Sequence, residues 1–134
     1  MKNIYKKLVD AAKNAMKKSY SPYSRFRVGA ALMINENKIY TGTNIENASY
    51  GLAICAERVA IFKALSEGEK KFKAIAVIPD SKDFCYPCGA CLQVMSEFNK
   101  DIDIILGNNR AKFKMIKLPQ LLPNSFKLNK RKNN

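Results

Sequence analysis

Histidine is absent from this sequence of 134 residues. Imidazole is a common metal ligand and general base, so a site in this chain has to use other groups. Thiols and carboxylates are the main alternatives, and the chain has four cysteines. The search for a site therefore turns to cysteine and acidic residues.

The sequence also lacks an apolar run that approaches a membrane span. Its first 18 residues interleave lysines with apolar residues and have no signal-peptide h-region. We therefore expect a cytoplasmic protein with no membrane partner. In a reducing compartment, cysteines favour metal binding or catalysis over disulfides.

Acidic residues are scarce, since 11 Asp and Glu stand against 24 Lys and Arg, a formal net charge of +13. Such a balance can indicate nucleic-acid binding. However, the lysines are spread over the whole chain, only residues 127–134 form a cluster, and arginine does not alternate with aromatic residues. A solvated lysine-rich surface explains the charge at least as well, so nucleic acid is not the partner we expect.

No repeat or interdomain linker interrupts the chain, and its length suits one domain. We place this domain at residues 1–126 and expect a mobile basic tail at 127–134. Apolar periodicity and breakers predict helices over 3–18, 53–65 and 88–98, and strands over 26–34, 38–43, 74–78, 102–106 and 113–118. Only residues 107–112 link the last two strands, which is too short for a parallel crossover, so that pair is predicted to be antiparallel. The order indicates one layered α/β domain.

Two of these segments carry more specific predictions. The first helix places four apolar residues on one face, which we expect to be buried: Ile4, Leu8, Ala11 and Ala15. The strand at 26–34 is rich in small residues, and this predicts close approach of another backbone or a ligand.

Two thiols three positions apart, Cys88 and Cys91, follow Pro87 at a predicted helix start. Proline is favoured at the first helical position, and the N–H groups and dipole of a helix start stabilise thiolates. A third thiol, Cys55, stands two residues before Glu57 at another predicted helix start. Three protein ligands leave one zinc position open for water, beside a carboxylate that can move protons. We therefore predict one Zn²⁺ per chain, held by the three thiols, with Glu57 catalytic.

Cys85 allows two other interpretations. All four cysteines could form a closed structural zinc site, and Cys85-x-x-Cys88-x-x-Cys91 is similar to part of an iron–sulfur run that lacks its fourth, Pro-flanked cysteine. Pro87 argues against both, because it places Cys85 outside the helix. Neither interpretation gives Glu57 a role, so we treat Cys85 as a spare thiol.

Three thiolates on one zinc carry net negative charge, so hydrogen-bond donors should draw electron density from the sulfurs. Arg58 and Gln93 are our candidates. Arg58 directly follows Glu57, and Gln93 stands two residues after Cys91.

An amide and a carboxylate follow the strand at 38–43, namely Asn44 and Glu46. Because they are two residues apart, their side chains lie on the same side if the backbone stays extended. This pair suits a sugar hydroxyl, and it also suits plain loop chemistry.

Together these segments resemble the cytidine deaminases that act on free nucleosides. The resemblance extends over nearly the whole chain to Phe126. It rests on five motifs in order: Pro22-Tyr23-Ser24-x-Phe26-x-Val28-Gly29-Ala30-Ala31, Asn44-Ile45-Glu46-Asn47-Ala48-x-Tyr50, Cys55-Ala56-Glu57-Arg58, Pro87-Cys88-Gly89-Ala90-Cys91-x-Gln93 and Leu121-Leu122-Pro123-x-x-Phe126.

The resemblance implies a three-layer α/β/α fold with a five-stranded mixed sheet, assembled as a homotetramer. Phe26 would pack on the pyrimidine, and Asn44 with Glu46 would hold the ribose 3′-hydroxyl. Three further residues would complete the sites of neighbouring subunits: Ala48, Tyr50 and Phe126. The substrate-binding set also includes Ala56.

The implied reaction is hydrolytic deamination of cytidine and deoxycytidine to uridine and deoxyuridine, with release of ammonia, in pyrimidine salvage. Zinc makes hydroxide available near neutral pH, and Glu57 shuttles protons to ring N3 and to the leaving amino group. Two rivals remain, a deaminase that edits bases within nucleic acid and a non-catalytic four-cysteine zinc module. The short link at 107–112 argues against the first, because polynucleotide deaminases place a helix between those strands.

Overall fold

The computed structural model describes residues 2–131 of the chain. Its helices and strands, in chain order, are α1 (Asn3–Met16), β1 (Val28–Asn35), β2 (Lys38–Thr43), the 3-10 turn η1 (Tyr50–Leu52), α2 (Ala56–Ser66), β3 (Ala74–Pro79), α3 (Gly89–Phe98), β4 (Asp103–Gly107), β5 (Phe113–Lys117) and α4 (Leu118–Leu121). The strands form one five-stranded sheet in the order β2-β1-β3-β4-β5. The pair β3–β4 is parallel and the other three pairs are antiparallel, which confirms the mixed sheet and the predicted final hairpin.

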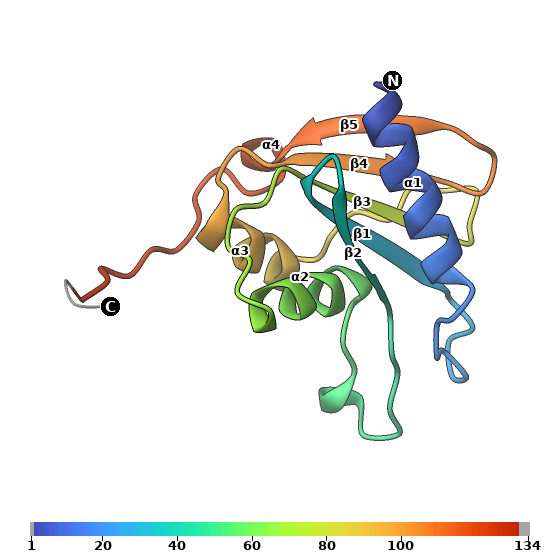
Figure 1. Ribbon diagram of the computed structural model, residues 1–134. Helices are drawn as coiled ribbons and strands as arrows, with labels where there is room; N and C mark the ends of the chain where they lie inside the picture. Colours follow the sequence, from blue (N-terminus) through green and yellow to red (C-terminus); the bar gives the residue numbers. More distant parts are fainter. Residues whose placement is uncertain (1, 132–134) are drawn as a thin grey trace.

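The sheet lies between α1 on one face and α2 with α3 on the other (Figure 1). Successive residues of β1 point to opposite faces of the sheet. Ala31 and Met33 pack against α1, whereas Ala30 and Leu32 pack in the core on the α2 side. Every residue of the central strand β3 is buried, as its continuous apolar run predicts. The three-layer α/β/α architecture is therefore confirmed.

The buried face of α1 differs slightly from the predicted one. Leu8 and Ala15 are buried as expected, but Ile4 and Ala11 are only partly buried. The centre of the face is shifted by about one position, toward residues that pack under the sheet: Tyr5, Val9 and Ala12. Tyr5 can be buried because its hydroxyl has a hydrogen-bond partner far along the chain, Asp103 in β4.

Two glycines let helix backbones approach the sheet closely. A Cβ on Gly29 would lie 2.0 Å from the carbonyl oxygen of Ala12 in α1. A Cβ on Gly42 would lie 2.5 Å from both the Ala56 carbonyl oxygen and the Ala60 amide nitrogen in α2. The predicted backbone approach at the small residues of β1 is thus present, and β2 makes the corresponding contact with the start of α2.

The starts of α2 and α3 differ from their predicted positions. Helix α2 begins at Ala56 instead of residue 53, because Ile54 is still extended and pairs with Ile45. Pro87 does not occupy the first helical position of α3, since Cys88 is the extended N-cap residue and the helix begins at Gly89. Cys55 is likewise the N-cap of α2. Each helix start thus presents a cysteine.

No helix within residues 2–131 is both long enough and apolar enough to cross a membrane.

Candidate active site

Three thiols converge where the starts of α2 and α3 meet. The Sγ atom of Cys88 lies 3.8 Å from that of Cys55 and 3.5 Å from that of Cys91. All three sulfurs lie within 4.8 Å of one another. A tetrahedral zinc with Zn–S bonds of about 2.3 Å holds its sulfurs about 3.8 Å apart, so these thiols fit the ion. Cys85 is not part of the group, although it contacts the same core.

The surroundings favour thiolates at this cluster. Cys55 and Cys88 cap their helices and Cys91 lies in the first turn of α3, where free N–H groups and the helix dipole stabilise negative charge. A hydrogen bond from Cys91, together with Arg58, lowers the pKa of Cys55 to about 5. The same hydrogen bond, with burial, raises the pKa of Cys91. A cluster that carries a thiolate at neutral pH is ready to bind a soft cation.

Glu57 is a buried acid next to the thiols. It is the second residue of α2 and its exposed fraction is 4%. Burial raises its pKa to about 7, and the nearby charge of Cys55 acts in the same direction. A carboxyl group with such a pKa accepts and donates protons at neutral pH, which is what a proton shuttle requires.

Arg58 follows on the same helix and reaches back to the cluster. Its Nη2 lies 3.7 Å from the Sγ of Cys55, and its Nε is buried without a hydrogen-bond partner. A guanidinium beside sulfur can offset the negative charge of thiolates, so this contact is compatible with the role predicted for Arg58.

Gln93 makes a different contact from the predicted one. Its Nε2 donates to the carbonyl oxygen of Phe126 at 2.8 Å, and its Oε1 accepts from the Phe126 amide at 3.0 Å. These two bonds direct the side chain away from the sulfurs, and within residues 2–131 no hydrogen bond joins Gln93 to a cysteine. Gln93 therefore ties the C-terminal segment to α3. Sequence spacing could not reveal this, because the partner is a distant backbone.

A cavity of about 310 Å³ opens beside Glu57 and the thiols. That volume suits a small organic ligand. Its walls come from four regions of the chain: Phe26 and Val28, residues 44–46, residues 53–57, and Cys85 with Tyr86 and Cys88. The cavity gathers six of the predicted site residues besides Cys88: Phe26, Asn44, Glu46, Cys55, Ala56 and Glu57. Cys85 and Tyr86 are wall residues that the sequence analysis did not assign to the site.

Asn44 fixes one wall of this cavity. Its Oδ1 accepts from Ser19 Oγ at 2.5 Å and from the Val28 amide at 2.9 Å, while its Nδ2 donates to the Phe26 carbonyl oxygen at 2.7 Å. These bonds join the strand end to the segment before β1. One N–H of the Asn44 amide group remains for another acceptor.

Glu46 also binds the segment that precedes β1, at Tyr23 and Ser24. Its carboxylate accepts from the backbone amides of Tyr23 and Ser24 and from the Ser24 hydroxyl. The hydrogen bond from Ser24 is the main reason that the pKa of Glu46 is lowered. Arg25 adopts a left-handed conformation (φ 59°) immediately before Phe26, which aims the chain into the cavity wall at a cost in backbone strain.

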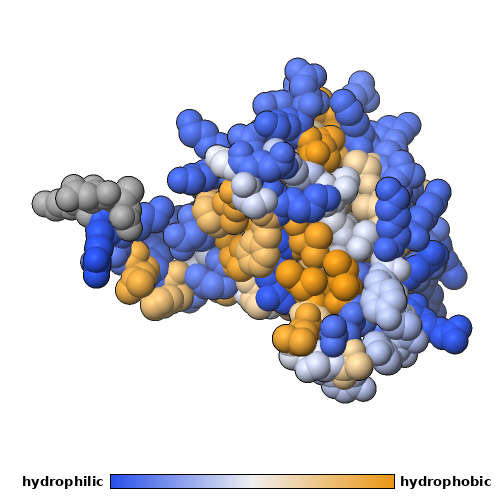
Figure 2. Space-filling model, turned by 60° about the horizontal axis from the view of Figure 1, so that its bottom comes forward, coloured by the Kyte–Doolittle hydropathy of each residue, from blue (hydrophilic) through white to orange (hydrophobic). Residues whose placement is uncertain are grey.

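Three of the predicted substrate-binding residues lie outside this cavity. Ala48, Tyr50 and Phe126 are exposed, with exposed fractions of 82% for Tyr50 and 65% for Phe126. Tyr50 belongs to η1, in a segment that projects from the body of the molecule (Figure 1). On the face that includes this segment, apolar side chains form a patch within polar surroundings (Figure 2).

A three-thiol cluster with a buried carboxyl group at the floor of a cavity is the arrangement of a zinc-dependent hydrolase. Residues 2–107 match the family model described as the cytidine and deoxycytidylate deaminase zinc-binding region. The chain therefore belongs to the cytidine and deoxycytidylate deaminase family. It is a zinc-dependent deaminase with one zinc ion per chain as its cofactor.

Relatives and solved structures agree with this assignment. The cytidine deaminase of Halalkalibacterium halodurans is 49% identical over 120 residues, which cover 89% of this chain and 91% of the relative. A probable cytidine deaminase of Dictyostelium discoideum is 50% identical over 121 residues, covering 90% of this chain and 82% of the relative. The crystal structure of cytidine deaminase from Burkholderia pseudomallei superposes with a TM-score of 0.86 at 44% identity, covering 94% of this chain and 100% of that one.

Proposed function

We propose that this protein deaminates free cytidine and deoxycytidine to uridine and deoxyuridine, with release of ammonia, in pyrimidine salvage in the cytoplasm. The observation that carries the proposal is the buried carboxyl group of Glu57 beside three converging thiols at a nucleoside-sized cavity. Relatives named cytidine deaminases, at 45–50% identity over most of the chain, support the choice of substrate.

In the proposed mechanism Cys55, Cys88 and Cys91 hold the zinc ion, which supplies a bound water of lowered pKa when present. Glu57 accepts one proton of that water and donates it to ring N3, while the water oxygen forms a bond to C4. Glu57 then carries the second proton of that oxygen to the 4-amino group, and the C4–N bond breaks to release ammonia. The burial that raises the pKa of Glu57 suits both directions of transfer.

The proposed substrate contacts are made by the wall residues. Phe26 packs on the pyrimidine ring, and Ala56 lines the cavity beside Glu57. The free N–H of Asn44 and the carboxylate of Glu46 receive the 3′-hydroxyl. Because both groups are held by the loop at 19–26, they are oriented before substrate binds.

We also propose that the protein is a homotetramer in which Ala48, Tyr50 and Phe126 complete neighbouring sites. Large apolar side chains that are this exposed are typical of interaction surfaces. The catalytic unit is proposed to be residues 1–126, with 127–134 as a basic tail. Of that tail, residues 132–134 lie outside the described residues.

A panel of substrates tests this function. We expect good turnover of cytidine, measured as loss of ultraviolet absorbance, and poor turnover of cytosine and 3′-deoxycytidine, because the polar groups that read the sugar are left unpaired, a loss that can reach ~10⁴-fold. A 3′-phosphate would meet Glu46, so 3′-CMP should not react. Deamination of an oligonucleotide at a rate comparable to that of cytidine would overturn the proposal in favour of a nucleic-acid-editing enzyme.

A further inference from the structure

A second cavity lies at the C-terminal end of α3, whereas the thiols lie at its start, and the C-terminal segment passes this end of the helix. Its volume is about 380 Å³, and it shares no lining residue with the active-site cavity. Polar and basic side chains supply much of its lining: Ser96, Lys100, Asp101, Asn124, Ser125 and Lys127. The deamination reaction described above gives these residues no task.

Two lysines line this cavity, Lys100 after the end of α3 and Lys127 after Phe126. Their side chains lie close together, because a side-chain contact with Lys100, and then its charge, lowers the pKa of Lys127. Neither lysine forms an ion pair with a carboxylate within residues 2–131. Two like charges held close together repel one another, and an anion between them removes the repulsion.

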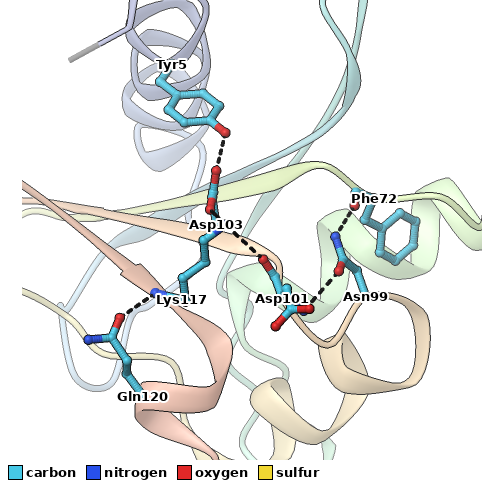
Figure 3. A network of polar contacts seen from close by, with 7 residues as sticks. All are labelled: Tyr5, Phe72, Asn99, Asp101, Asp103, Lys117 and Gln120. Carbon is cyan, nitrogen blue, oxygen red and sulfur yellow. Dashed lines mark hydrogen bonds and ion pairs between the residues drawn. The ribbon is translucent and has the colours of Figure 1, made fainter.

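The remaining polar groups are compatible with an anionic ligand. The side chains of Asn124 and Ser125 make no hydrogen bond within residues 2–131, so their donors are free. Asp101 is the acidic member of the lining, and its backbone oxygen accepts from Lys117 at 3.4 Å (Figure 3). The lining therefore contains two cations and one carboxylate, which leaves a net positive charge.

We propose that this cavity binds a phosphate group, as orthophosphate or as part of a mononucleotide, between Lys100 and Lys127. Lysine binds phosphate as a point charge, and the cavity is large enough for a small molecule. The bound phosphate fixes the C-terminal segment, because Lys127 directly follows Phe126, whose backbone is already held by Gln93. The binding does not depend on which nucleoside the active site accepts.

The test is a titration of the zinc-loaded protein with ligand at constant ionic strength, in which binding is monitored through the NMR chemical shifts of the backbone amides. Orthophosphate, AMP and adenosine are compared on the wild type, on the double variant Lys100→Gln with Lys127→Gln, and on the control Lys70→Gln with Lys71→Gln. The control removes the same two charges from an exposed link between α2 and β3. Hydrogen exchange of residues 122–128 is measured with and without ligand.

We expect saturable shifts near residues 100 and 122–127 in the wild type and the control, with binding weakened at least about tenfold in the Lys100/Lys127 variant. Exchange of 122–128 should slow on binding, and adenosine should cause no shift at these residues. The tighter of orthophosphate and AMP identifies the source of the phosphate. Equal affinity in both double variants, or no saturable shift up to about 10 mM ligand, would overturn the proposal.

Discussion

Cys85 and Cys88 are three residues apart, yet they differ in their relation to the proposed metal. Cys88 caps α3 and lies within reach of two other sulfurs, whereas Cys85 lies in the preceding loop, where burial raises its pKa to about 11. Its sulfur is not among the three that lie within 4.8 Å of one another. Cys85 is therefore a wall of the cavity and not part of the cluster.

Metal analysis of purified variants checks this distinction. Cys85→Ser should retain about one zinc per chain and most of the activity, because three ligands remain in place. Cys55→Ala, Cys88→Ala and Cys91→Ala should each lose the metal. Equal zinc loss in Cys85→Ser would instead favour a closed four-cysteine site.

A site residue was predictable from the sequence where the residues that it contacts lie close to it along the chain. The thiols and Glu57 were predictable because helix starts and short spacings place them. The contacts of Asn44 and Glu46 with the loop at 19–26 were not, because they depend on where a distant segment turns back onto the strand. The contact of Gln93 with the backbone of Phe126 was not predictable for the same reason.

At the scale of elements, the contact between β2 and α2 sets the position of the start of α2, which carries Glu57. Gly42 lies against the backbone of Ala56 and Ala60, with no room for a side chain. Gly42→Ala should displace α2, destabilise the fold by about 1–3 kcal/mol and reduce turnover. Gly51 has open space around its Cα, so Gly51→Ala is the matched control.

Denaturant unfolding and turnover of both glycine variants measure this effect. If Gly42→Ala were as stable as Gly51→Ala and as active as the wild type, the close approach of α2 to β2 would not constrain the site.

A second contact between elements predicts a pH dependence of stability. The Tyr5 hydroxyl in α1 donates to Asp103 at the start of β4, and Lys117 in β5 pairs with the same carboxylate at 2.6 Å (Figure 3). Burial, then the hydrogen bond and charge of Asp103, raise the pKa of Tyr5 from 10.0 to about 12. Burial of Asp103 acts to raise its pKa, but Lys117 and Tyr5 outweigh burial and lower it.

The directions of these two pKa shifts define an alkaline and an acid pH range in which stability is lost. Because the pKa of Tyr5 is raised on folding, its contribution is present below pH 10 and is lost as the pH rises from 10.0 to about 12. The contribution of Asp103 is present above its ordinary pKa of 3.8 and is lost as the pH falls below it. The free energy of unfolding of Tyr5→Phe should therefore fall less steeply than that of the wild type as the pH rises above 10. That of Asp103→Asn should fall less steeply than that of the wild type as the pH falls below 3.8. Parallel curves for wild type and variants would contradict this account.

The order of the elements, the buried central strand and the final hairpin were predictable because apolar runs and a short link determine them. The exact helix starts were not, because Cys55 and Cys88 are extended N-cap residues whose role depends on the neighbouring helix. The Tyr5–Asp103 contact spans 98 positions, and no local pattern reveals such a pair.

At the scale of the whole molecule, the exposed apolar side chains predict assembly. Light scattering should give a mass of about four chains, since a shared interface would cover Tyr50 and Leu52, whose exposed fractions in one chain are 82% and 71%. Tyr50→Asp should weaken the assembly and raise the KM for cytidine, while Tyr23→Asp tests whether any exposed aromatic has the same effect. A fully active monomer would contradict the proposed sharing of sites.

Turnover of cytidine by zinc-loaded Glu57→Gln tests the central claim most directly. The amide preserves the shape of the buried side chain but cannot carry protons, so zinc content and fold should match the wild type. Uridine and ammonia formation should fall by at least ~10²–10⁴-fold, the usual contribution of a proton-transfer group. Near-normal turnover by the zinc-loaded variant would contradict the account. Glu46, the other carboxyl group that lines the cavity within residues 2–131, is held by Tyr23 and Ser24 and is assigned to the sugar.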